Sequence, residues 1–93
     1  MQISMELRFT PMVQFSLLVK AGGRLREFNF RKLKSPEQET VTVNVCDDRG
    51  DRILFRMQKM ETDWQITQEN LPAWITQNEP GLRQALEEEL RKW

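Results

Sequence analysis

Four short turn signals divide residues 13–67 into five runs of alternating apolar and polar residues, and this division constrains the fold more than any other feature. The signals are Gly22-Gly23, Ser35-Pro36, Asp48-Arg49-Gly50 and Glu61-Thr62. Alternation with a period of two is typical of strands with one buried face. The sequence therefore predicts an antiparallel β-meander of five strands over residues 13–67.

Three of the four turns also predict a strand register that brings apolar residues together on one face of the sheet. A two-residue turn suits Gly-Gly because glycine tolerates positive φ, and a three-residue loop suits Asp-Arg-Gly for the same reason at its last position. A shift by one residue would send every apolar side chain to the opposite face, so the pattern specifies the register. The predicted pairs are Leu17–Phe28, Phe15–Phe30, Val45–Ile53, Val43–Phe55, Val41–Met57, Met57–Ile66 and Lys59–Trp64.

The hydrophobic period changes after residue 70. Pro72 suits the first position of a short helical turn, and Asn78 suits the N-cap of a second helix. Apolar residues of that helix recur at helical spacing, which predicts an amphipathic helix that covers the apolar sheet face. These residues are Leu82, Ala85, Leu86, Leu90 and Trp93.

The predicted fold class is α+β: an antiparallel meander of five or six strands with a C-terminal amphipathic helix packed on one face. We expect one domain over residues 1–93, with the meander at 13–67 and the helical segment at 70–93. Residues 1–11 also alternate, from Ile3 to Phe9, and form either an extra edge strand or a disordered leader.

The residue inventory argues against enzymatic chemistry. The chain has no histidine, no tyrosine and one cysteine, Cys46, so most common acid, base and nucleophile arrangements are missing. Asp47, Asp48 and Asp51 surround a turn glycine, but their spacing does not match a calcium loop. We therefore expect a non-enzymatic protein with no catalytic residues, no metal site and no cofactor.

A basic segment in the second predicted strand is a candidate anion-binding site. Its five cations, interleaved with Phe28 and Phe30, are Arg24, Arg26, Arg31, Lys32 and Lys34. Aromatics among cations are typical of nucleic-acid binding, but the predicted register commits both rings to the core, and the formal net charge of the chain is zero. Binding of nucleic acid or another polyanion is therefore the alternative function.

The leading function from the sequence is a small interaction or adaptor domain with a protein partner, working through a strand edge or an apolar rim. Trp74 and Trp93 are candidate partner-binding residues, although aromatics of small domains more often close the core. Monomer and homodimer both stay open. A single cysteine favours a reducing, cytoplasmic location, and the absence of a long apolar run argues against a membrane span.

Overall fold

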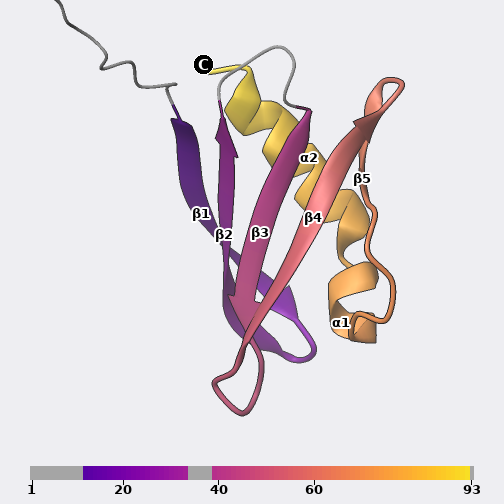
Figure 1. Cartoon of the computed structure of the whole chain (residues 1–93). Coiled ribbons are helices and arrows are strands. Elements are labelled where there is room, and N and C mark those ends of the chain that lie inside the picture. Colours follow the sequence, from indigo (N-terminus) through magenta and orange to yellow (C-terminus); the bar gives the residue numbers. More distant parts are fainter. Residues whose placement is uncertain (1–11, 34–38, 93) are drawn as a thin grey trace, which may run out of the picture.

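The computed structural model describes residues 12–33 and 39–92, which form five antiparallel strands in a curled sheet and two short helices (Figure 1). The strands follow the chain in spatial order β1-β2-β3-β4-β5. The elements are β1 (Met12–Ala21), β2 (Arg24–Leu33), β3 (Thr40–Cys46), β4 (Arg52–Met60), β5 (Asp63–Ile66), α1 (Ala73–Thr76) and α2 (Glu79–Leu90). The small α+β fold with a five-stranded meander is thus confirmed. Residues 1–11 and the predicted turn at Ser35-Pro36 lie outside the described residues.

All seven predicted cross-strand pairs occur in the structure. Gly22 and Gly23 have φ of 66° and 83°, and Gly50 has φ of 84°. These left-handed conformations are the ones that the two turn types need, and glycine adopts them without a steric penalty. Turn chemistry and alternation agree at the β1–β2 and β3–β4 hairpins, so the register of these two strand pairs is specified twice over.

The core lies on one face of the sheet, where the inward side chains of all five strands meet. Phe15 of β1 stacks on Phe30 of β2 with ring centroids 4.6 Å apart and planes 4° from parallel. Such cross-strand aromatic pairs stabilise a sheet beyond the area they bury. The fully buried sheet residues include Phe28, Val41, Val43, Val45, Phe55 and Met57.

The start of each helix differs in detail from the sequence prediction. Pro72 is the N-cap of α1 instead of its first residue, and Asn78 is the N-cap of α2 but makes no capping hydrogen bond. The Asn78 side-chain amide donates to the carbonyl of Trp74 at 2.7 Å, so it joins the two helices instead. Glu79 accepts a hydrogen bond from the Ile66 amide at 2.8 Å, which ties the first turn of α2 to β5.

Helix α2 lies behind the sheet in Figure 1, and β1 forms the left edge. Leu82 and Leu86 of α2 are fully buried and belong to the same apolar cluster as the inward residues of β2, β3 and β4. Arg83 also donates to the carbonyl of Trp64 in β5 at 2.8 Å. The apolar cluster is therefore continuous from the sheet to α2.

No helix among residues 12–33 and 39–92 is long and apolar enough to cross a membrane.

Replacing Leu86 tests whether α2 is an integral part of the core. Because Leu86 is fully buried, we expect Leu86→Ala to lower the free energy of unfolding by about 2–5 kcal/mol. The control Glu88→Ala changes an exposed position of the same helix and should cost less than about 0.5 kcal/mol. Urea melts of both variants measure the difference. A Leu86→Ala protein that melts like wild type would show that α2 does not stabilise the sheet.

Candidate functional site

The four predicted anion-binding cations that the structure describes are not gathered into one site. Arg24 and Arg31 are exposed, Arg26 is buried, and Lys32 is half-buried. Burial lowers the pKa of the Lys32 amine, and the nearby charge of Lys59 lowers it further against the opposing effect of Glu39. Lys34 lies outside the described residues. Anion binding by these residues stays a prediction.

Arg26 instead joins three parts of the fold at one end of the sheet. Its guanidinium donates to the carbonyls of Ala21 at 2.7 Å and of Cys46 at 3.4 Å, and to the carboxylate of Asp48 at 2.9 Å. A buried guanidinium needs partners of this kind, because an unpaired buried charge is strongly destabilising. We call this set of contacts the Arg26 junction.

Trp74, a predicted partner-binding residue, completes the Arg26 junction. The guanidinium carbon of Arg26 lies 3.9 Å from the Trp74 ring centroid, a cation–π geometry, and the ring meets Phe28 edge-on at 6.5 Å. A Cβ on Gly22 would lie 3.1 Å from both side chains, so glycine allows this close approach as well as the turn. The second predicted partner-binding residue, Trp93, lies outside the described residues.

Asp48 is the acidic member of the Arg26 junction. Its carboxylate accepts from Arg26 and also pairs with exposed Arg24 at 3.1 Å. The hydrogen bond and charge of Arg26 lower the Asp48 pKa, with a smaller contribution from Arg24. The structure thus uses two predicted anion-binding cations and one predicted partner-binding aromatic for contacts within the fold.

Strand parity would have been the signal for this role of Arg26. Arg26 has the same parity as Phe28 and Phe30, so a strand that buries both rings directs Arg26 inward as well. Sequence reasoning assigned the rings to the core without extending the same rule to the arginine.

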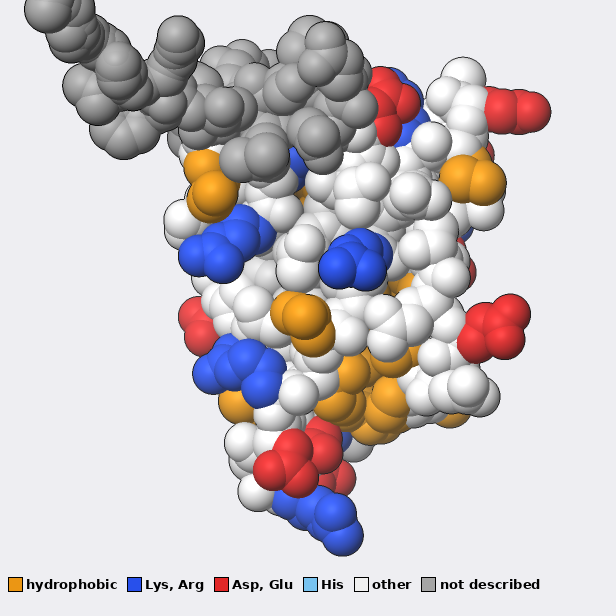
Figure 2. Space-filling view, in the orientation of Figure 1, with side chains coloured by type: hydrophobic (Ala, Val, Ile, Leu, Met, Phe, Trp, Pro, Cys, Tyr) orange, Lys and Arg blue, Asp and Glu red, His pale blue; other side chains and the backbone are white. Residues whose placement is uncertain are grey.

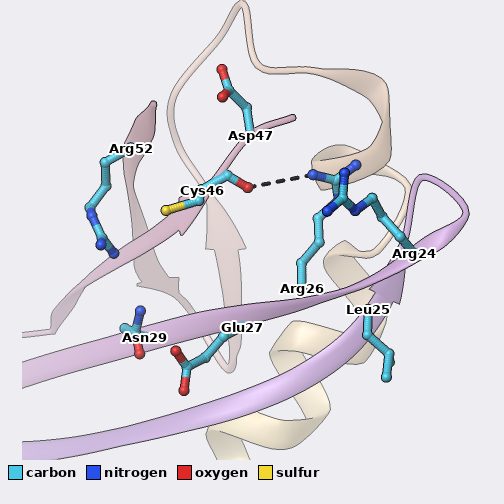
Figure 3. Close-up of a pocket in the computed structure, with 8 residues that line it drawn as sticks. All are labelled: Arg24, Leu25, Arg26, Glu27, Asn29, Cys46, Asp47 and Arg52. Atoms are coloured by element: carbon cyan, nitrogen blue, oxygen red, sulfur yellow. Dashed lines mark hydrogen bonds between the residues drawn. The ribbon is translucent and has the colours of Figure 1, made fainter. Parts of the chain in front are cut away.

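A small pocket of about 210 Å³ opens beside the Arg26 junction, where β2 and β3 separate (Figure 3). The β2–β3 ladder ends at the Asn29–Asn44 pair, before β3 reaches Cys46. The pocket has three arginines and two acids, and its lining residues are Arg24, Leu25, Arg26, Glu27, Asn29, Cys46, Asp47 and Arg52. Arg52 already donates to Asn44 at 2.7 Å. The pocket carries charges of both signs, and several of them already bond to other groups of the protein. Its lining therefore favours no class of ligand.

The outer face of the sheet, opposite α2, is also mixed in character (Figure 2). A row of hydrogen bonds crosses four strands there, from Ser16 through Asn29 and Asn44 to Arg52. Lys and Arg side chains stand apart from one another in this view. Stacking of nucleic-acid bases on a sheet requires exposed aromatic rings, whereas Phe28 and Phe30 are buried.

The clearest candidate for a binding surface is the edge of β1. We define the open edge as the side of β1 that faces away from β2; within residues 12–33 and 39–92, no strand pairs with it. β1 is ten residues long and pairs with β2 at all ten positions, without a bulge. It contains no proline and only one charged residue, Lys20. Edge strands are usually protected from pairing with other chains by bulges, prolines or several charged side chains. Because β1 has no bulge, no proline and a single charge, its edge is suited to pairing.

In the middle of β1, the side chains next to the open edge are mostly apolar and incompletely covered, whereas Val13 and Ala21 near its ends are buried. On the core face, Phe15, Leu17 and Val19 are only half-buried, although their cross-strand partners in β2 are buried. On the outer face, Leu18 is 68% exposed. The edge therefore combines backbone groups that can form hydrogen bonds with apolar surface on both sides of the strand.

Backbone geometry indicates which amides point to the open edge. In an antiparallel ladder, the backbone groups of successive residues point to alternate sides. Ala21 pairs with Arg24 to close the two-residue turn. The backbone N–H and C=O groups of Ala21 and of the other odd-numbered residues of β1 therefore point toward β2. The even-numbered residues, such as Ser16 and Leu18, direct their N–H and C=O groups outward.

Comparisons with protein-family models, curated proteins and solved structures return no match for this chain.

Also, within the described part of the chain, no three His, Cys, Asp or Glu side chains are grouped so that they could hold a metal ion.

Removal of the Arg26 guanidinium should destabilise the fold. Arg26→Met keeps much of the side-chain volume but loses the contacts to two carbonyls, Asp48 and Trp74, and we expect a loss of about 1–3 kcal/mol in urea melts. Arg24→Met is the matched control, because the Arg24 guanidinium pairs with the same carboxylate but the side chain is 62% exposed. It should cost less than about 1 kcal/mol. Equal stabilities for the two variants would contradict a structural role for the Arg26 junction.

Proposed function

We propose that this protein is an interaction domain that binds an extended segment of a partner protein along the open edge of β1. The partner adds a strand to the sheet, and its backbone hydrogen bonds supply much of the affinity. The observation that carries the proposal is a ten-residue edge strand, regularly paired on its inner side and nearly uncharged.

The half-buried side chains of β1 define the chemistry of the partner. A strand added to this edge places alternate side chains on the core face, beside Phe15, Leu17 and Val19. Apolar residues at these positions bury more surface, while residues of the other parity lie near Ser16 and Leu18 on the outer face. The preferred partner is therefore an extended segment with alternating apolar residues and no proline.

In this proposal α2 is an amphipathic cover for the apolar face of the central strands and leaves the β1 side for the partner. Leu82 and Leu86 support that role because they are fully buried in the common cluster. Arg83 and Glu79 hold the helix over β5, at the far side of the sheet from β1. We also propose a reducing, cytoplasmic location, because the only cysteine, Cys46, is exposed as a free thiol.

No observation favours polyanion binding to the same degree. Arg26 is buried and engaged, and Arg24 already pairs with Asp48. The partner is for this reason proposed as a protein segment and not a nucleic acid.

Proline at position 18 tests strand addition at the open edge. Leu18→Pro removes an N–H group that points outward, but the N–H groups that bond to β2 remain. The fold should therefore survive, whereas binding of an added strand should be lost. Ten-residue peptides are first selected by display on wild-type protein. We expect the enriched peptides to alternate between apolar and polar residues and to lose at least about tenfold in affinity for Leu18→Pro.

Leu18→Gln is the matched control, because it removes the same exposed side chain but keeps the amide. Selected peptides should lose clearly less affinity for Leu18→Gln than for Leu18→Pro, because Leu18→Gln changes the side chain alone. Circular dichroism melts establish that both variants are folded. Selected peptides that bind folded Leu18→Pro as well as they bind wild type would place the binding surface elsewhere.

A further inference from the structure

The alternation of β1 makes this strand complementary to a second copy of itself. Two copies related by a two-fold axis perpendicular to the sheet would pair antiparallel and keep both core faces on the same side. With the axis at Leu17, Leu17 faces its own copy and Phe15 faces Val19. Every core-face residue of β1 then meets an apolar residue, as cross-strand pairing requires.

We propose that the occupant of the open edge is a second copy of this chain, so that two sheets join through their β1 strands into one continuous sheet. This inference rests on the proposed function, because it names the partner of the same edge. The half-buried residues Phe15, Leu17 and Val19 of one protomer and their copies then form one apolar band across the axis.

Charge is compatible with this pairing. Lys20 is the only charged residue of β1, and the axis at Leu17 places it opposite Gln14 of the other copy. The two Lys20 side chains lie at opposite ends of the paired strands, so no like charges face each other. A partner of different sequence needs its own matching alternation, whereas a second copy has it by symmetry.

The other edge of the sheet is less suited to self-pairing. β5 has four residues, compared with ten in β1, and Ile66 of β5 already donates its amide to Glu79 of α2. A sheet that grows from both edges would form an open chain of molecules, but growth from β1 alone closes as a dimer.

Sedimentation equilibrium of the full chain, from micromolar to millimolar protein, tests the dimer. We expect a reversible monomer–dimer equilibrium for wild type and for Leu18→Gln. Leu18→Pro removes one intermolecular hydrogen bond from each protomer, two in the dimer, so its dimer dissociation constant should rise by at least about 100-fold. The melts described above show that each variant is folded.

Each other outcome overturns the dimer and reports separately on the proposed function. If the wild type is a monomer but binds display-selected peptides, and Leu18→Pro weakens that binding, then strand addition at the open edge is upheld. The partner is in that case a different protein or another segment of this chain. A monomer that binds no peptide contradicts both proposals. A dimer that is unchanged in folded Leu18→Pro places the dimer contact on another surface.

Discussion

Five strands present one apolar face, and in the proposed arrangement the 12-residue helix α2 covers it. Strands lie about 4.8 Å apart, so the sheet is about 19 Å wide, whereas a helix with its side chains is about 10 Å across. One helix therefore covers about two strands at any point along the sheet. The fully buried residues lie mainly on β2, β3 and β4. In the middle of β1, Phe15, Leu17 and Val19 are only half-buried, whereas Val13 and Ala21 near its ends are buried. We propose that this incomplete cover makes β1 suitable as a binding edge.

The Arg26 junction lies at the end of the sheet where β2 and β3 separate and lack ladder hydrogen bonds. Ladder hydrogen bonds between these strands stop at the Asn29–Asn44 pair. Beyond it, one guanidinium connects the carbonyls of Ala21 and Cys46, the loop carboxylate of Asp48 and the ring in α1. A charged side chain replaces missing backbone pairing here, which explains why a cation is buried in a small domain.

The strand pattern allowed the sheet to be predicted nearly in full, because alternation and turn chemistry are local signals that agree. Positions 22, 23 and 50 need left-handed backbone, and glycine stands at each of them. The helix starts were less predictable, since Asn78 bonds to Trp74 of a neighbouring helix instead of capping its own. The β1 edge was anticipated only as a general possibility. Which edge is incompletely covered depends on where α2 packs, and that is a tertiary property without a local sequence signal.

Hydrogen exchange of individual β1 amides, with and without a bound strand, is the most direct measurement of the role proposed for this edge. The even-numbered residues Gln14, Ser16 and Leu18 direct their amides outward, so their exchange should slow strongly when either a second copy or a selected peptide binds. The amides of Phe15, Leu17 and Val19 face β2 and should change little. Binding that leaves the outward amides unchanged and protects residues elsewhere would contradict strand addition at β1.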